Sequence, residues 1–435
     1  MDTNKNVTEI LNALREEIKS SQSHLIVAVD IGKFNNCACF MVSNGKVLRK
    51  QFSFHNHRGG FDSLMNQLHY HLKKENYQGV IFSMEPSGYY WEHLYQYLSL
   101  NEKTVVLVTP LAVSRNRETI NVSKDKTDPK DAYNIGDLTM QGKFFFPLQR
   151  SKGVSQLRRF VNIYYRIMKD KIVVRNLLRN AVGAVFPELE KYFKDIEAMT
   201  ILTILEKYPV VSMITAIEKL EFVDYIKKQH PHFSHNRINE IYELAKTSVG
   251  IIDEDDSFVY EIQWLLTQLK TFRSQLSDVN QQIDAIVKDR DDYQILLSIS
   301  GIGPVIAVGI ITEIGDIANF NSGKQLIKLA GLDLWSENSG TSVHTLKHIT
   351  KRGRKLLRTL MYQAALGAIR TDGVLKQKYL QLLDNQPQKK KMRAKAVVAI
   401  GCKLLRIIFR MLTDKIKYNE LYEQELKEKH LKKPA

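Results

Sequence analysis

The sequence is poor in cysteine and has no long apolar run. Its 435 residues include only three cysteines, too few for a disulfide framework or a four-ligand zinc site. Cys37 and Cys39 lie two apart in a strand-like stretch, so we expect both to be small core residues. No stretch of about 18 uninterrupted apolar residues occurs, and the N-terminus lacks a signal-peptide pattern. We therefore expect a soluble, cytoplasmic protein.

Acidic residues are scarce in the last part of the chain. Residues 341–435 contain 23 Lys and Arg but only 7 Asp and Glu, whereas the first 340 residues contain 40 of each sign. The whole net charge of +16 therefore lies in the C-terminal part. Because its basic residues alternate with apolar residues at helical spacing, they indicate a folded surface that binds nucleic-acid phosphates. A basic tail that only improves solubility is the alternative.

Strand-like and helix-like segments alternate near the N-terminus. After a polar helix around 7–20, three strands are expected at 24–31, 37–43 and 47–54, the last two joined by the hairpin signal Asn44-Gly45. The segments that follow are a helix near 59–74, a strand at 79–84, a helix at about 88–99 and a strand at 104–109. This order predicts an α/β sheet and fits several α/β folds. One of them is the ribonuclease H-like fold, in which a meander of three antiparallel strands precedes parallel ones, and the acids at the strand ends favour it.

Beyond Pro147 the pattern is that of long helices. Apolar residues from Ile262 to Ile286 alternate spacings of three and four, which predicts a coiled-coil seam. An earlier basic helix near 157–176 can pair with it as an antiparallel hairpin within one chain or between subunits. The domains we expect are an N-terminal extension over 1–22, a catalytic domain over 23–148, a helical coiled-coil region over 149–290 and a mainly α domain over 291–435.

Four acidic residues stand where a magnesium site would need them. Asp30 follows one apolar strand, Glu85 follows another, and Asp128 and Asp131 lie one turn apart near a helix start. Their oxygens can converge on hard cations, and two such ions about 4 Å apart stabilise both oxygens of a phosphoryl transfer. Each acid also has a possible structural role that involves no metal: Asp30 and Glu85 can be strand-end residues, Asp128 can cap the helix, and Asp131 can be favoured by the helix dipole.

The C-terminal part carries a turn, a polar loop and basic helices. Gly301-Ile-Gly303 is a turn between apolar helices that either contacts DNA phosphate or serves packing. Ser339 lies in the polar loop 333–345, where it is a candidate nucleophile or an ordinary turn residue; His344 and His348 form no recognisable triad with it. The basic residues from which we expect nucleic-acid contacts are Lys33, Lys126, Lys351, Arg354, Arg358, Lys395 and Lys403.

Seven short motifs resemble, in their order, one known family. They are Val29-Asp30-Ile-Gly-Lys33, Glu85-Pro-Ser-Gly88-x-Tyr90, Lys126-Thr-Asp128-x-x-Asp131-Ala, Gly301-Ile-Gly303, Ala330-Gly-Leu, Ser339-Gly340 and Lys351-x-Gly353-x-x-x-Leu357-Arg358. The family is that of the DEDD-type transposases of insertion sequences, which includes pilin-gene DNA invertases and RNA-guided serine recombinases. The chain departs from it at Ser300 and Leu334, where the family usually has proline.

The resemblance implies a Holliday-junction-resolvase-like domain in which Asp30, Glu85, Asp128 and Asp131 bind one or two Mg²⁺ ions. It implies that Ser339 forms a transient phosphoserine bond with double-stranded donor and target DNA. It also implies a noncoding bridge RNA as guide and a homo-oligomer, a dimer or a tetramer, associated with the nucleoid. The alternatives are a metal-dependent nuclease that uses water, and a nucleic-acid-binding protein without catalytic activity.

Overall fold

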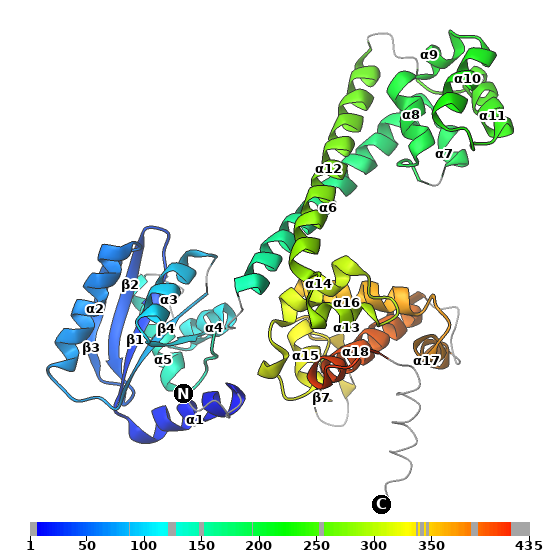
Figure 1. Ribbon diagram of the computed structural model, residues 1–435. Coiled ribbons are helices and arrows are strands. Elements are labelled where there is room, and N and C mark those ends of the chain that lie inside the picture. Colours follow the sequence, from blue (N-terminus) through cyan, green and yellow to red (C-terminus); the bar gives the residue numbers. More distant parts are fainter. Residues whose placement is uncertain are drawn as a thin grey trace, which may run out of the picture. The chain divides into compact units, whose positions relative to one another are not determined.

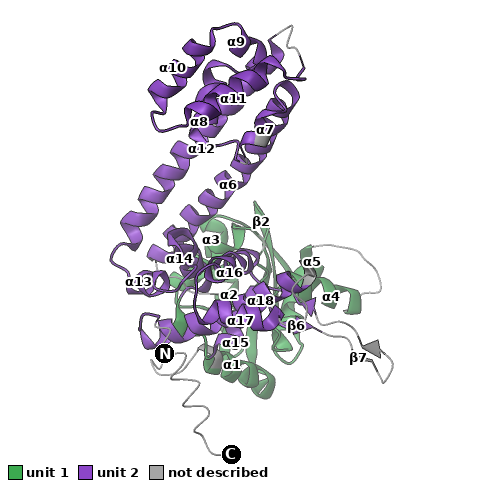
Figure 2. Ribbon diagram, turned by 90° about the vertical axis from the view of Figure 1, so that its right-hand side faces the viewer, with its two compact units in different colours: residues 1–149, 316–321 green, residues 150–315, 322–435 purple. Residues whose placement is uncertain are grey.

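The computed structural model describes residues 7–86, 88–120, 128–147, 152–193, 195–251, 256–335, 338–339, 343–344, 348–383 and 390–418. The chain divides into two compact units (Figure 2). Unit 1 comprises residues 1–149 and 316–321, and unit 2 comprises residues 150–315 and 322–435. Unit 1 contains a five-stranded sheet, whereas unit 2 is built mainly from helices. The protein is therefore mixed α/β and mostly helical.

The sheet of unit 1 combines antiparallel and parallel strands. Its strands are β1 (His24–Asp30), β2 (Asn35–Val42), β3 (Val47–His55), β4 (Gly79–Met84) and β5 (Thr104–Leu107), in the spatial order β3-β2-β1-β4-β5. β1, β2 and β3 pair antiparallel, whereas β4 is parallel to β1 and to β5. The predicted meander followed by parallel strands is present, and the turn between β2 and β3 has Gly45 at φ 93°, as Asn-Gly turns require.

Helices cover both faces of this sheet (Figure 1). The helices of unit 1 are α1 (Val7–Ser21), α2 (Arg58–Leu72), α3 (Tyr90–Leu100), α4 (Pro110–Ile120) and α5 (Asp128–Met140), with the short 3₁₀ helix η1 (Ile317–Asn319). Leu25, Val27 and Val29 of β1 share a core with α2 and α3. Ile26 and Ala28 belong to the opposite core, with α1, α4 and α5. Because side chains alternate along a strand, an apolar run such as β1 is buried on both faces.

Two long helices run side by side in unit 2 (Figure 1). They are α6 (Lys152–Val185) and α12 (Ser257–Val287), which share one apolar core. Of the two pairings that the sequence leaves open, the structure has the hairpin within one chain. At one end of this hairpin lie α7 (Leu189–Tyr192), α8 (Met199–Lys207), α9 (Val211–Thr215), α10 (Lys219–Gln229) and α11 (His235–Lys246).

The rest of unit 2 is a helical cluster. It consists of α13 (Asp291–Leu297), α14 (Pro304–Ile314), α15 (Gly323–Ala330), α16 (Lys355–Ala368), α17 (Val374–Leu383) and α18 (Lys390–Asp414). Gly301 precedes α14 with φ 87°, and a Cβ there would lie 2.3 Å from the Ala368 backbone nitrogen. Gly301 therefore serves close packing against α16. Among the described helices, none has the length and apolar character needed to cross a lipid bilayer.

Candidate functional site

Strand alternation places two of the predicted acids on one face of the sheet. Asp30 ends β1 two residues after Ala28, whose side chain faces α5. Glu85 directly follows β4 and lies two residues after Ser83, whose hydroxyl hydrogen-bonds Thr139 of α5 at 2.5 Å. Residues two apart on a strand share a face, and β1 and β4 are parallel neighbours. Both carboxylates therefore lie at the C-terminal ends of these strands, on the face that packs against α5.

The first turn of α5 supplies the other two acids. The helix starts at Asp128 with Pro129 next to it, a favoured position for proline, and Asp131 follows one turn later. Carboxylates at a helix N-terminus are stabilised by the helix dipole. The side chain of Asp131 is only 5% exposed. Nε of Arg117 in α4 donates to its Oδ1 at 2.8 Å, and Nη2 of Arg117 forms an ion pair with the same oxygen at 2.6 Å.

The four acids line one cavity of about 380 Å³. We call it the acid cavity; its lining residues are Asp30, Ile31, Gly32, Asn35, Glu85, Pro110, Val113, Ser114, Arg117, Asp128 and Asp131. They come from β1, β2, α4, α5 and the segments that follow β1 and β4. The acids are far apart in sequence but are brought together by the packing of α5 on β1 and β4.

Cys37 reports on the charge around the acid cavity. Burial raises the pKa of its thiol to about 11, with further contributions from the negative charges of Asp128 and Asp30. Cys37 pairs with Asp30 across β1 and β2 and is buried, as the sequence predicts. The negative charges of acids from two separate elements therefore both act on the Cys37 thiol.

The donor set of the acid cavity is the chemical type that magnesium prefers, since all four side chains offer carboxylate oxygens. Within the described residues, however, no three His, Cys, Asp or Glu side chains converge closely enough to hold a metal ion by themselves. One oxygen of Asp131 is occupied by Arg117. The residues fit magnesium by chemistry and by location, and their side chains have to move closer together for coordination.

Sequence reasoning missed two polar residues near Asp131. Arg117 belongs to α4 and lies fourteen positions before its partner; no local motif signals such a pair. Asn134 follows Asp131 by one turn of α5, is 1% exposed, and neither its oxygen nor its nitrogen has a hydrogen-bond partner among the described residues. A buried amide without hydrogen-bond partners costs free energy.

Ser339 lies in unit 2, in a segment with very short strands. We call residues 333–350 the serine hairpin. β6 (Leu334–Trp335) pairs with β9 (His348–Ile349), and β7 (Asn338–Ser339) pairs with β8 (Val343–His344), with Ser339 opposite Val343. Only the backbone of Ser339 is described, so its side-chain contacts and those of His344 lie outside the described part. The sequence predicts a polar loop over 333–345, whereas the described residues of this segment include short paired strands.

Hydrogen bonds and tight backbone packing fix the base of the serine hairpin. Thr350 donates to Asp333 through its backbone nitrogen at 2.9 Å and through its hydroxyl at 2.6 Å. Gly331 caps α15 in the left-handed conformation, with φ 64°. A Cβ on Gly353 would lie 2.4 Å from the carbonyl oxygen of Leu329. The base therefore needs glycine where these backbones approach one another.

The predicted basic contacts fall into two groups. Lys33 lies over the ring of Phe34 at 4.9 Å, and Lys351 and Lys395 are exposed. Arg354 and Arg358, in contrast, donate to backbone carbonyls of unit 2, those of Glu313 and Ala330. Burial lowers the pKa of the Arg354 guanidinium, and the charge of Glu313 opposes this shift. Both arginines thus contribute to the fold. Lys126 lies outside the described residues.

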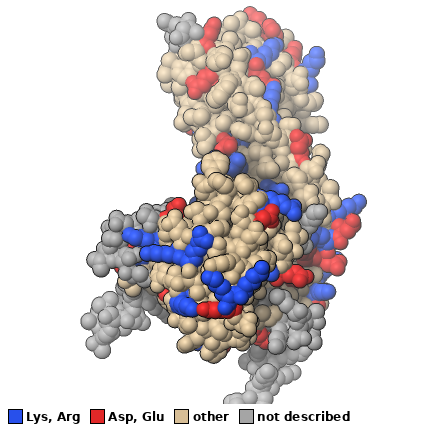
Figure 3. Space-filling view, turned by 90° about the vertical axis from the view of Figure 1, so that its left-hand side faces the viewer, with Lys and Arg blue, Asp and Glu red and all other residues tan. Residues whose placement is uncertain are grey.

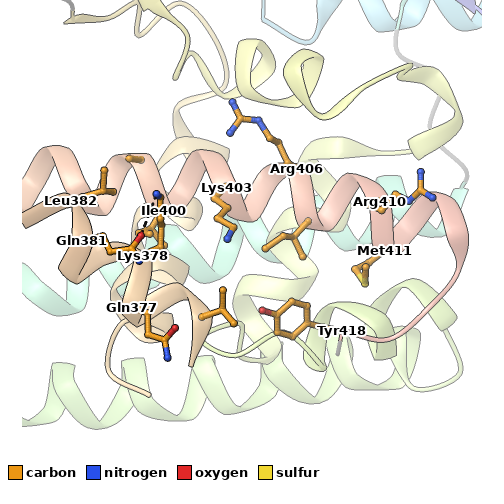
Figure 4. Close-up of a pocket in the computed structure, with 13 residues that line it drawn as sticks. Gln377, Lys378, Gln381, Leu382, Ile400, Lys403, Arg406, Arg410, Met411 and Tyr418 are labelled. Carbon is orange, nitrogen blue, oxygen red and sulfur yellow. Dashed lines mark hydrogen bonds between the residues drawn. The ribbon is translucent and has the colours of Figure 1, made fainter. Parts of the chain in front are cut away.

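Lys403 lines a groove of about 540 Å³ between α17 and α18. Figure 4 shows Lys403 extending into this groove, which Arg406 also lines. Lys378 and Arg410 also line it, together with the apolar side chains of Ile400 and Met411. The groove combines positive charge with apolar surface, which is the combination that nucleic acid strands require.

Positive charge is not limited to the C-terminal part. Figure 3 shows groups of Lys and Arg side chains on a face where Asp and Glu are interspersed. Locally positive regions attract polyanions even where the total charge is balanced.

Two parts of the chain match models of known protein families. Residues 27–187 match the DEDD model of IS110-type elements, described as a transposase. Residues 293–380 match the transposase IS116/IS110/IS902 family. Together the two matches cover more than half of the chain. The first contains Asp30, Glu85, Asp128 and Asp131, and the second contains Ser339.

Individual relatives are distant in sequence but extensive in coverage. An uncharacterized 43.6 kDa protein of insertion element IS110 from Streptomyces coelicolor is 21% identical, over 66% of this chain and 71% of its own. An uncharacterized 44.8 kDa protein of insertion element IS116 from Streptomyces clavuligerus is 24% identical, over 67% and 72%. The pilin gene-inverting protein of Moraxella bovis is 22% identical, over 90% and 96%.

Proposed function

Because the chain belongs to the IS110/IS116 family of insertion-sequence transposases, we propose that it cuts and rejoins DNA through a transient phosphoserine bond at Ser339. The observation that supports this most directly is the acid cavity, where four carboxylates from separate elements meet within a transposase domain. We propose that unit 1 is a ribonuclease H-like, Holliday-junction-resolvase-like domain, in agreement with its strand order. Relatives named as pilin gene-inverting proteins favour recombination as the reaction type.

In this proposal Asp30, Glu85, Asp128 and Asp131 hold one or two magnesium ions. Magnesium, when bound, supplies positive charge that stabilises the oxygens of a phosphoryl transfer. Arg117 fixes one oxygen of Asp131 and so limits the positions that this carboxylate adopts.

The chemical step exchanges one phosphodiester for another. The Oγ of Ser339 forms a bond to phosphorus, its proton is lost, and the bond to a deoxyribose oxygen breaks as that oxygen takes up a proton. The new serine phosphodiester keeps the energy of the broken bond. A hydroxyl of another DNA strand then attacks the same phosphorus and releases Ser339, so no external energy source is needed.

Basic surfaces hold the substrates in this scheme. The excess of 16 positive charges in residues 341–435, the exposed Lys351 and Lys395, and the groove that contains Lys403 favour contacts with DNA phosphates. We propose that a structured bridge RNA selects the donor and target sequences and that the active form is a homo-oligomer. Both proposals rest on the resemblance of the motifs.

Covalent trapping tests the serine mechanism. A labelled duplex of the element's joined ends is incubated with the protein, its co-purified RNA and Mg²⁺, and then resolved under denaturing conditions. We expect a protein–DNA adduct that Ser339→Ala abolishes while DNA binding is retained. Ser63→Ala, at an exposed serine of α2, is the matched control and keeps the adduct.

Two other results would replace the proposal. Free DNA ends without attached protein, formed equally by Ser339→Ala, would indicate a nuclease that uses water. Tight binding without cleavage of any element DNA would indicate a nucleic-acid-binding protein without catalytic activity. Sequencing of the co-purified RNA tests the guide separately: one abundant RNA from the element's flank is expected, and random cellular RNA would contradict it.

A further inference from the structure

Asn35 brings an uncharged amide to the acid cavity, whose lining otherwise includes four carboxylates. It is the first residue of β2 and lies two positions before Cys37, so the two side chains share a face of the sheet. Cys37 shares a small apolar cluster with Ala132 of α5, and the negative charges of Asp128 and Asp30 act on its thiol. The Asn35 side chain therefore lies on the face of the sheet where the acids gather.

A hydrogen bond orients this amide. Nδ1 of His55, the strand partner of Asn35 at the end of β3, donates to Asn35 Oδ1 at 2.7 Å. The His55 ring stacks on that of His57, with ring centroids 5.3 Å apart. His57 is itself held, because its Nδ1 accepts from the backbone nitrogen of Gly60 in α2. The carbonyl end of the Asn35 amide is thus engaged by His55, and Nδ2 is its donor end.

The turn between Asp30 and Asn35 is held at Gly32. The Gly32 backbone nitrogen donates to the side chain of Asn36 at 3.1 Å, and the side-chain nitrogen of Asn56 donates to the Gly32 carbonyl at 3.2 Å. A Cβ on Gly32 would lie 2.2 Å from the carbonyl oxygen of Asn35, so this close approach requires glycine. The backbones that carry the Asp30 carboxylate and the Asn35 amide are therefore fixed relative to each other.

A phosphodiester in the acid cavity needs hydrogen-bond donors as well as cations, because ionised carboxylates only accept. Of the other side-chain donors that line the cavity, Arg117 is bound to Asp131, and the hydroxyl hydrogen of Ser114 rotates about its bond. We propose that Nδ2 of Asn35 donates to a non-bridging oxygen of the phosphodiester that is cut, and that His55 is the positioning residue that orients this amide. The inference rests on the proposed function for the presence of that phosphodiester.

Cleavage rates of Asn35 variants test the contact. A fluorescein-labelled duplex of the element's joined ends is incubated with the protein, its co-purified RNA and Mg²⁺, and all cut strands are counted, with or without attached protein. At saturating DNA, confirmed by anisotropy, we expect Asn35→Ala to cut about 100-fold more slowly, the loss typical of one donor to developing negative charge. Asn35→Asp, of the same shape, should be at least as slow because it offers only acceptors. Asn44→Ala, in the exposed turn after β2, is the matched control and keeps the wild-type rate.

His55 variants separate orientation of the amide from its contact with phosphate. His55→Ala leaves the donor but removes the bond that orients it, so we expect cutting to slow by about tenfold. His55→Asn, which can place an amide nitrogen near the position of Nδ1, should restore most of the rate. In the Asn35→Ala background His55→Ala should have no further effect, because the amide that it orients is gone. His93→Ala, at an exposed histidine of α3, is the control and keeps the wild-type rate.

Sulfur substitution in the DNA identifies the atom that is contacted. At the phosphate mapped from the wild-type cut, sulfur replaces one non-bridging oxygen, which gives two diastereomers. Sulfur is the weaker hydrogen-bond acceptor, so one diastereomer should slow the wild type more than it slows Asn35→Ala. A role of Asn35 in stability alone would leave this sulfur effect unchanged in the variant.

The contrary results are distinguishable. Cutting at the wild-type rate by Asn35→Ala would overturn the inference while the proposed function stands. Slow cutting by Asn35→Ala with the full sulfur effect for both diastereomers would assign Asn35 to the structure of the turn and would also overturn it. Absence of cut strands with the wild-type protein would contradict the proposed function itself, and the inference with it.

Discussion

The acid cavity and the serine hairpin are held in place in opposite ways. The acids come from strand ends and a helix that are part of the core of unit 1, and the Asp131 side chain is only 5% exposed. Ser339 stands on strands of two residues, and the hairpin is fixed where it joins unit 2, through Thr350, Gly331 and Gly353. The acid cavity is part of the core of unit 1, whereas the serine hairpin is joined to unit 2 at its base.

This difference separates stability from chemistry. Where functional side chains are buried and paired, a substitution disturbs the fold and the reaction together. For Ser339 we expect instead that substitution changes the reaction alone, and that the fold responds to changes at the hairpin's base. The following substitutions test this contrast in order of expected effect.

The largest effect is expected at Gly353. A Cβ there would lie 2.4 Å from the oxygen of Leu329 and 2.5 Å from the nitrogen of Gly331, both backbone atoms that side-chain rotation cannot move. Gly353→Ala should therefore lower the free energy of unfolding by about 3 kcal/mol. Denaturant unfolding measures this loss. Because the loss affects unit 2, formation of the Ser339 adduct should stop at a temperature at which unit 1 is still folded.

If Gly353→Ala unfolds at the same denaturant concentration as the wild type, the backbone at the base of the hairpin can shift to accept the methyl group without loss of stability. The contrast between the two sites would then lose its structural basis.

The next effect is expected at Asp131. Asp131→Ala removes the carboxylate that pairs with both donors of Arg117, which is 21% exposed, and leaves that guanidinium partly buried without its counter-charge. We expect a loss of about 2 kcal/mol in unfolding free energy. Ser339→Ala should leave the unfolding free energy unchanged. Both variants should lose adduct formation, so only the stability measurement separates them.

A double-mutant cycle with Arg117→Ala sharpens this comparison. If the pair acts as a unit, the double variant is about as stable as Asp131→Ala alone, since the second substitution removes the unpaired charge. Additive losses from the two single substitutions would show instead that the two residues contribute independently, and the acid cavity would not be coupled to the core through Arg117.

Local patterns were sufficient to place the four acids at the ends of elements, because Asp30 and Glu85 stand at strand ends and Asp128 and Asp131 lie in the first turn of one helix. The apolar run that ends at Val29 predicts β1 and places Asp30 at its edge, and Pro129 marks the start of α5 beside Asp128. The heptad spacing from Ile262 to Ile286 likewise predicts α12, since a buried helical face leaves a direct signature.

Features that depend on long-range contact could not be predicted in this way. Arg117 carries no signal of its pairing with Asp131, and Arg354 looks like a surface cation until packing turns it toward Glu313. The strands of the serine hairpin are too short for any alternation of polar and apolar residues to be seen. The pairing of α6 with α12 within one chain likewise requires the tertiary structure.

A substitution at Lys351 is expected to raise the free energy of unfolding, by less than the substitutions at Gly353 and Asp131 lower it. This residue follows the serine hairpin and adopts the left-handed conformation, with φ 54°. For a residue with a Cβ this conformation costs about 1 kcal/mol. Lys351→Gly should therefore stabilise unit 2 by about that amount while weakening DNA binding through the lost charge. Unfolding and anisotropy measure the two effects, and Lys351→Asn, which tolerates this conformation better than most residues, separates charge from strain. Equal stability of all three proteins would show that the base carries no strain.

The smallest effect is expected at Gly183 of α6, which receives the same substitution as Gly353 in the opposite environment. A Cβ on Gly183 meets nothing within 4 Å, and alanine in a helix interior is favoured over glycine by about 0.5–1 kcal/mol because it restricts the unfolded chain. Gly183→Ala should therefore raise the unfolding free energy, whereas Gly353→Ala lowers it. Denaturant unfolding of the two variants, side by side, isolates the effect of available space, since the added methyl group is identical. If both substitutions destabilise unit 2, the loss at Gly353 reflects a general intolerance of unit 2 to added bulk, and the argument that the serine hairpin is fixed by glycine at its base would fail.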